Sequence, residues 1–164
     1  MIRHAVINDA SRIAEIHVLG WQCAYKGIVS DEYLFKTISV NKRIKYFKKA
    51  IEENLEETYV YDDTGLIKAF MTIGKSRNED KKKAFELWGL YVEPLLKGQG
   101  IGTEMIKYCE KCAIEREYKE IILWVFKKNE KSRKFYEKMG YLSDGKEEMI
   151  EYFKELEVRY SKIL

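Results

Sequence analysis

The chain has 164 residues, of which 46% are hydrophobic and 35% are charged, and its net charge is only +3. This length predicts one domain over residues 1–164, and the near-balanced charge argues against a nucleic-acid partner. The chain lacks both a run of 18 apolar residues and a signal-peptide pattern, so we expect a cytoplasmic protein with no membrane partner.

The first quarter of the chain predicts a short strand followed by helices. Apolar residues recur at helical spacing from Ile13 to Ala24, and Ser30 and Ser39 can each cap a further helix. His17 lies on the apolar face of the first helix, a position more typical of a hydrogen-bonded core histidine than of a catalyst.

The rest of the chain alternates strand and helix patterns. Residues 74–83 predict a mobile loop, and Glu86, Trp88, Leu90 and Val92 are expected on one face of the strand after it. The order predicts a mixed α/β sheet of about seven strands with flanking helices. The expected strands are 1–6, 57–61, 66–73, 84–92, 121–126, 141–153 with a turn or bulge at Gly145, and 155–161; the later helices are 99–118 and 130–138.

The three cysteines do not predict a disulfide framework or a metal site. Cys109 and Cys112 form a CxxC pair within a predicted helix, with no second pair and no nearby histidine. We expect both to be structural thiols in or near the core.

A glycine-rich loop joins a predicted strand to a long predicted helix. Gly98, Gly100 and Gly102 stand on alternate positions, where the lack of side chains lets backbone N–H groups close on an anion. The loop predicts a pyrophosphate site, although a simple strand-to-helix turn is the alternative. The GxxxxGK[ST] and GxGxxG patterns both fail, because Thr103 stands where a glycine is required.

A second motif follows at residues 129–141, with Asn129, Ser132, Phe135, Tyr136, Gly140 and Tyr141. The two motifs together resemble the GNAT N-acetyltransferases, whose patterns are [QR]xxGx[GA] and NxxSxxFYxxxG[FY]. Lys97 departs from the Gln or Arg that is usual at its position. Residues 2–34 are similar to the N-terminal region of many bacterial members, so the resemblance covers nearly the whole chain and is weakest over residues 39–82.

The resemblance implies the GNAT acyl-CoA N-acyltransferase fold and an enzyme that uses acetyl-CoA as cosubstrate, without a metal. In this family the fourth and fifth strands splay apart around the pantetheine arm. The residues that the resemblance assigns to acetyl-CoA are Leu90, Tyr91, Val92, Lys97, Gly98, Gln99, Gly100, Ile101, Gly102, Thr103, Asn129, Ser132 and Tyr136. Asn129 can also cap the helix after it, and the two roles are compatible.

Two residues are candidates for proton transfer. An alkylamine has a pKa of about 10 and has to lose a proton before it attacks a thioester. By resemblance Tyr136 is the acid that protonates the departing thiolate, with simple packing as the alternative. Glu86 is the candidate base, with bulk water as the alternative. No cysteine has a paired histidine in sequence context, so we expect direct attack by the amine in a ternary complex.

The expected acceptor is a primary amine of a small molecule, a peptide or a protein. The resemblance places the first helix and the loop after it beside the acceptor, which makes Trp21 and Tyr25 candidate substrate residues; aromatic residues at helical spacing are also typical of a core. A non-catalytic acyl-CoA sensor on the same fold is the alternative function. The resemblance is also compatible with a homodimer through the last two strands.

Overall fold

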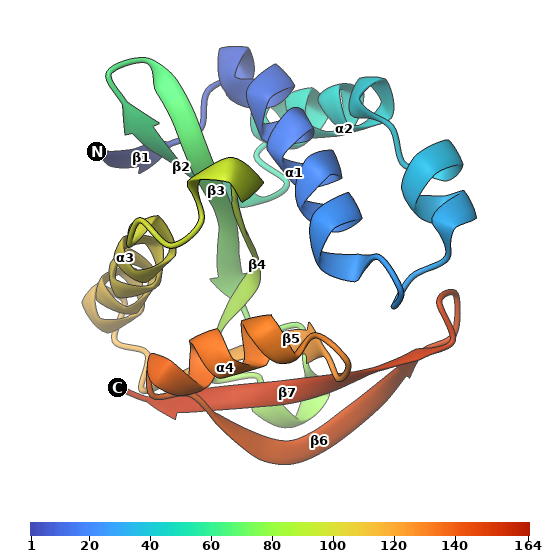
Figure 1. Ribbon diagram of the computed structural model, residues 1–164. Helices are drawn as coiled ribbons and strands as arrows, with labels where there is room; N and C mark the ends of the chain where they lie inside the picture. Colours follow the sequence, from blue (N-terminus) through green and yellow to red (C-terminus); the bar gives the residue numbers. More distant parts are fainter.

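A computed structural model describes residues 1–164, which form one seven-stranded sheet flanked by helices, in the strand order β1-β2-β3-β4-β5-β7-β6 (Figure 1). The predicted mixed α/β class is therefore confirmed. The strands are β1 (Ile2–His4), β2 (Glu57–Asp63), β3 (Leu66–Lys75), β4 (Phe85–Val92), β5 (Glu120–Phe126), β6 (Leu142–Ile150) and β7 (Glu155–Ile163), and the helices are α1 (Ala10–Tyr25), α2 (Val40–Glu52), α3 (Ile101–Glu115) and α4 (Glu130–Lys138). Short helical turns lie at Ile7–Asp9, Tyr33–Thr37, Glu79–Lys81 and Pro94–Leu96.

The helices form two layers. The apolar stripes of α1 and α2 pack on one face of the sheet, where Ile13, Ile16 and Phe47 meet Val60 and Phe70. A larger cluster on the other face joins α3 and α4 to β3, β4, β5 and β7. Cys109 and Cys112 lie in this second cluster, and burial raises the pKa of both thiols, as expected for structural cysteines.

Two of the helices begin at side-chain caps that the sequence predicts. The Ser39 hydroxyl accepts a hydrogen bond from the Lys42 backbone at 3.3 Å, and the Asn129 side chain accepts one from the Ser132 backbone at 3.3 Å. None of the helices is both long enough and apolar enough to cross a membrane.

Strands β4 and β5 are parallel neighbours that separate after three residue pairs. Phe85 pairs with Ile121, Glu86 with Ile122, and Leu87 with Leu123; the ladder stops there, whereas β4 continues to Val92 and β5 to Phe126. The backbone of residues 90–92 therefore has no β5 partner. This is the splay that the family resemblance implies.

A bulge in β4 changes which side chains share a face. Ile73 pairs with Leu87 and the adjacent Thr72 pairs with Gly89, so Trp88 is the extra residue. As a result Leu90 and Val92 pack with the α3 and α4 cluster, while Glu86 points to the opposite face. We predicted that Glu86, Trp88, Leu90 and Val92 would share one face, and this was wrong. The extra residue at the bulge moves the side chains after it to the other face of the strand.

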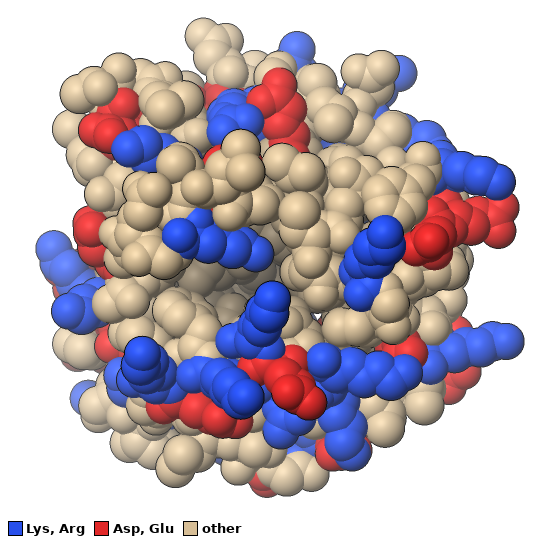
Figure 2. All heavy atoms as spheres, in the orientation of Figure 1, with Lys and Arg blue, Asp and Glu red and all other residues tan.

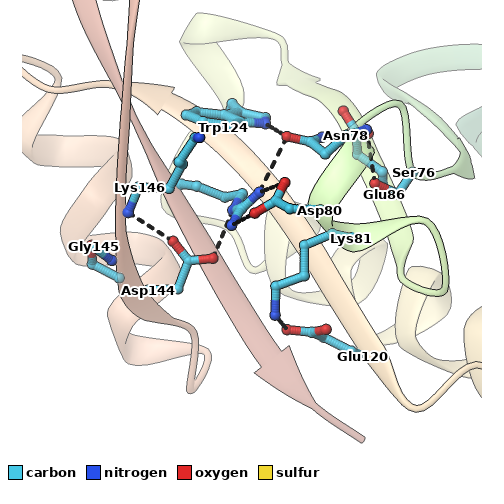
Figure 3. A network of polar contacts seen from close by, with 12 residues as sticks. Ser76, Asn78, Asp80, Lys81, Glu86, Glu120, Trp124, Asp144, Gly145 and Lys146 are labelled. Atoms are coloured by element: carbon cyan, nitrogen blue, oxygen red, sulfur yellow. Dashed lines mark hydrogen bonds and ion pairs between the residues drawn. The ribbon is translucent and has the colours of Figure 1, made fainter.

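Residues 76–84 connect β3 to β4 and are held by a polar network (Figure 3). Arg159 of β7 is 3% exposed and makes ion pairs with Asp80 at 2.7 Å and Asp144 at 2.6 Å. Asn78 accepts a hydrogen bond from the Trp124 indole at 3.1 Å, and Lys81 pairs with Glu120 at 2.7 Å. The sequence predicted a mobile loop here, but these contacts from β5 and β7 anchor it.

Candidate active site

A cavity of about 450 Å³ opens where β4 leaves β5. Its walls come from the end of α1, the unpaired end of β4, the loop before α3, the first turn of α3, and α4. The predicted acetyl-CoA residues that line it are Leu90, Tyr91, Val92, Lys97, Gly98, Gly100, Ile101, Gly102, Thr103, Asn129, Ser132 and Tyr136. Gln99 alone of the predicted set is not part of the lining.

The glycine loop has the geometry of an anion cradle. Gly98 and Gly100 both have φ of +84°, a conformation that side-chain-bearing residues rarely adopt, and Gly100 is the N-cap of α3. The first-turn N–H groups of α3 have no helical carbonyl to bond, and the helix dipole adds positive potential at that end. Gly102 serves packing instead, because a Cβ there would lie 3.3 Å from the ring of Phe135.

Basic side chains surround the entrance to this cavity. Figure 2 shows a hollow near the centre of one face with Lys and Arg side chains around its rim. Besides Lys97, the cavity lining includes Lys131 and Lys138 of α4. Sequence reasoning missed these two lysines, although their separation of seven residues places them on one side of a helix. They supply the charge that a phosphate-rich ligand requires.

Tyr136 and Asn129 reach the cavity from α4 and its N-terminus. A tyrosine phenol is protonated at neutral pH, and burial raises the pKa of Tyr136 further above its usual value. No hydrogen bond of the structure engages its hydroxyl, which leaves the proton free for a ligand. Asn129 is 7% exposed, and its side-chain oxygen accepts the capping hydrogen bond from the Ser132 backbone. Its NH₂ group is therefore the part that is free to donate to a ligand.

Glu86 lies on the opposite side of the sheet, 1% exposed, and its carboxylate is fully occupied. One oxygen accepts from the Arg77 side chain at 2.6 and 3.1 Å, and the other accepts from the Arg77 backbone at 2.7 Å and from Asn78 at 3.3 Å. A carboxylate has about four acceptor sites, and all are in use. This arrangement does not favour the predicted role of Glu86 as a base; it makes Glu86 an anchor for the loop at residues 76–84.

Trp21 and Tyr25, the predicted substrate residues, lie in an aromatic group at the end of α1. Tyr25 lines the cavity beside β4 and meets Phe126 edge-on at 5.0 Å between ring centroids. Trp21 lines neither that cavity nor the acidic pocket described next, and its indole donates to the Tyr91 hydroxyl at 3.0 Å. Trp21 thus positions Tyr91 through a hydrogen bond, whereas Tyr25 lines the cavity.

An acidic pocket of about 500 Å³ lies on the face of β5 and β7 that looks toward α1 and α2. Its lining contains five carboxylates and two basic residues: Glu79, Asp80, Glu86, Glu148 and Glu157, with Arg77 and Lys146. Several of these charges are paired within the network of Figure 3 or beside it. Glu148 and Glu157 have no partner, and they stand directly opposite each other on β6 and β7.

The sequence of the chain matches the model of the acetyltransferase (GNAT) family over residues 14–141. The chain belongs to the GNAT family. Its reaction is therefore transfer of an acetyl group from acetyl-CoA to an amine, and acetyl-CoA is its cosubstrate. The residues of the cavity also fit this cosubstrate. The cavity combines a glycine loop suited to phosphates, basic residues at the rim and an apolar slot beside the free end of β4.

Two relatives of this GNAT acetyltransferase, both named as N-acetyltransferases, agree with the assignment. The chain is 25% identical over 129 residues to the uncharacterized N-acetyltransferase YuaI of Bacillus subtilis, covering 78% of this chain and 72% of YuaI. It is 27% identical over 143 residues to a spermidine N(1)-acetyltransferase of Thermoplasma acidophilum, covering 85% and 86% of the two chains.

The fold itself is shared with PaiA N-acetyltransferase of Thermoplasma acidophilum, solved in complex with coenzyme A. The TM-score is 0.74 at 20% identity, with 97% of this chain and 96% of that chain covered. YncA of Salmonella typhimurium, solved with acetyl-CoA, gives a TM-score of 0.72 at 16% identity over 100% of this chain and 93% of its own.

Proposed function

We propose that this GNAT enzyme acetylates a primary amine of a small, positively charged alkylamine. The observation that carries the proposal is the placement of two pockets around the split between β4 and β5. The basic-rimmed cavity lies between the end of α1, the free end of β4, α3 and α4, and the acidic pocket is lined by the loop at residues 76–84 and by β4, β5, β6 and β7. An anionic cosubstrate and a cationic acceptor would each enter the side of matching charge.

The unpartnered carboxylates supply the selectivity for charge. Glu148 and Glu157 are unpaired like charges on adjacent strands, which is an unfavourable arrangement until a cation lies between or beside them. Trp124 lines the same pocket, and its ring already lies under a cation, the Arg159 guanidinium, at 5.6 Å. The Thermoplasma relative named as a spermidine acetyltransferase points to the same class of acceptor.

Different residues of the cavity would bind the cosubstrate and donate the proton. The N–H groups of Gly98 to Thr103 and the lysines at the rim would hold the pyrophosphate of acetyl-CoA, and residues 90–92 and Asn129 would hold the pantetheine arm. Tyr136 would protonate the departing thiolate, since its phenol is protonated at neutral pH and faces the cavity.

The proposed route is direct attack of the amine in a ternary complex. No thiol is placed to carry the acetyl group, because Cys109 and Cys112 are buried in the core and Cys23 lies outside both pockets. The comparisons give no support to the alternative of a non-catalytic acyl-CoA sensor.

The test is release of free CoA thiol from acetyl-CoA with a panel of amines. Spermidine and other alkyl diamines are expected to give the highest kcat/KM, ahead of single amino acids, an aminoglycoside and short peptides with a free N-terminus. Initial rates with both substrates varied should give intersecting double-reciprocal lines, as a ternary complex requires. A preference for peptides, or parallel lines, would contradict the acceptor or the route respectively.

A further inference from the structure

Acetyl transfer removes two protons from an alkylammonium nitrogen, and the protonated Tyr136 phenol cannot accept the one that has to leave before the nitrogen attacks. The C–N bond forms as the C–S bond breaks; one proton reaches the CoA sulfur and the second has to leave for solvent. Glu86 cannot take the proton that leaves the ammonium group without giving up one of its four hydrogen bonds to Arg77 and Asn78. A different acceptor of the proton is needed.

Glu157 occupies a suitable place at the split in the sheet. Glu157 of β7 pairs with Phe126, the last residue of β5, which lies three residues beyond the final β4–β5 pair. Val158 and Tyr160 point into the α3 and α4 cluster, so Glu157 points to the acidic pocket on the other face. Phe126 in turn contacts Tyr25, which lines the acetyl-CoA cavity, and so Glu157 lies where the two pockets approach each other.

The Glu157 carboxylate is also free to act. It is half-buried, and it takes part in none of the ion pairs and side-chain hydrogen bonds of the structure, in contrast to Glu86. Its pocket also contains Arg77, Glu86 and Lys146, and Glu148 lies opposite it on β6. Burial and the charge of Glu157 raise the pKa of the Tyr25 phenol on α1 and of the Tyr91 phenol on β4. Burial raises the pKa of Glu157; Arg77 opposes this, while Glu148 and Glu86 add to it. A raised pKa makes a carboxylate a stronger base.

We propose that Glu157 is the general base, accepting a proton from the acceptor ammonium group and passing it to solvent through the acidic pocket. In this scheme the ammonium loses its first proton to Glu157, and the neutral nitrogen attacks the thioester carbonyl carbon. As the amide forms, the nitrogen loses its second proton to solvent, the thiolate takes a proton from Tyr136, and the Tyr136 phenolate takes one back from solvent, so that one proton is released in each turnover. The inference rests on the proposed function, because it presupposes an amine acceptor on this side of the sheet.

The test compares Glu157→Gln with Glu148→Gln, using spermidine and the other active amines of the panel. Both variants remove one charge from the same pocket, but only Glu157→Gln removes the base. At pH 7 we expect kcat to fall about 100-fold in Glu157→Gln, within the usual range for acid–base catalysis. Glu148→Gln should instead raise KM for cationic amines and leave kcat within about 3-fold, a size typical of a lost partly exposed charge contact.

The pH dependence separates a base from a structural role. The Glu157→Gln deficit should shrink toward pH 9.5, because an amine with a pKa of about 10 then loses its proton to solvent unaided. Unchanged affinity for acetyl-CoA and an intact melting transition would show that the variant is folded. A Glu157→Gln enzyme with wild-type kcat at pH 7, or with a deficit that is the same at every pH, would overturn the inference.

Thiol release by the wild-type protein distinguishes failure of the proposed function from failure of the inference about Glu157. If the wild-type protein releases no thiol with any amine, the proposed function fails and the inference falls with it. If wild type is active and Glu157→Gln is equally active, only the inference fails.

Discussion

Leu87 of β4 and Leu123 of β5 are the last two residues that hold these strands together. Three residues further along β4, Leu90 begins the stretch that lines the acetyl-CoA cavity, and Phe126 lies three residues beyond Leu123. The broken ladder thus leaves an unpaired backbone edge for a ligand on β4. The predictions below test the groups placed around that break.

Replacing Tyr136 with Phe should lower kcat about 100-fold, as expected when a catalytic acid is lost, and leave the Kd for acetyl-CoA unchanged. Because burial keeps the Tyr136 pKa above its usual value, the loss should be the same from pH 6 to pH 9. Stopped-flow or steady-state thiol release measures it. Tyr141→Phe is the matched control: it also removes a buried hydroxyl without a hydrogen-bond partner, but that residue does not line the cavity. Equal losses in the two variants would contradict the assignment.

Replacing Gly100 with Ala should weaken acetyl-CoA binding. A side chain at φ +84° costs about 1–2 kcal/mol, and relieving that strain would turn the N–H groups of the cradle away from the phosphates. Calorimetric titration of acetyl-CoA measures the effect, and we expect at least about a 10-fold rise in Kd. Gly65→Ala carries the same kind of strain, at φ +93° in the turn between β2 and β3, and should destabilise the fold without changing Kd.

Replacing Arg159 with Gln should destabilise the protein by roughly 2–3 kcal/mol, because it leaves Asp80 and Asp144 without their buried partner. In a chain of this length that is a fall in Tm of about 5–10 °C. Arg116→Gln, which removes a more exposed pair with Glu57, should cost only about 1–2 °C.

The ion pair between Arg159 and Asp80 should also make the stability of the protein depend on pH at low pH. Arg159 lowers the pKa of Asp80 to about 2. A lowered carboxyl pKa stabilises the folded state at pH values above the ordinary pKa of about 4, and this contribution is lost as the pH falls toward 2. The difference in Tm between wild type and Arg159→Gln should therefore narrow between pH 4 and pH 2; a constant difference would mean that the pair adds no charge-dependent stability.

Replacing Glu157 with Gln should stabilise the protein at neutral pH, even though it lowers activity. A raised carboxyl pKa means that the ionised form is disfavoured in the folded state, so stability is lost as the pH rises through that pKa. Removing the repulsion from Glu148 should raise Tm by about 1–3 °C at pH 7. The gain should vanish near pH 4, where Glu157 is protonated in wild type. Melting curves at both pH values measure this.

Local patterns in the sequence predicted much of the acetyl-CoA side of the site. The glycine loop, the Asn129 cap and the buried run of β5 are each encoded by neighbouring residues, and the structure has all three. The acceptor side was harder to predict because it depends on partners far apart in the chain. Arg159 and Asn78 are separated by 81 positions, and the bulge at Trp88 exists only in the pairing of β4 with β3. Glu157, which the sequence showed only as one polar position in an alternating strand, was missed for the same reason.

The arrangement of the tryptophans provides a built-in optical probe. The chain has three: Trp21, Trp88 and Trp124. Trp124 lines the acidic pocket, Trp88 stacks under Arg77 beside it, and Trp21 supports Tyr91. All three lie on the side of the sheet that faces α1 and α2, and none lines the acetyl-CoA cavity. Their intrinsic fluorescence should therefore respond to a docked amine more than to acetyl-CoA, so that acceptor binding can be followed in the unlabelled protein without waiting for turnover.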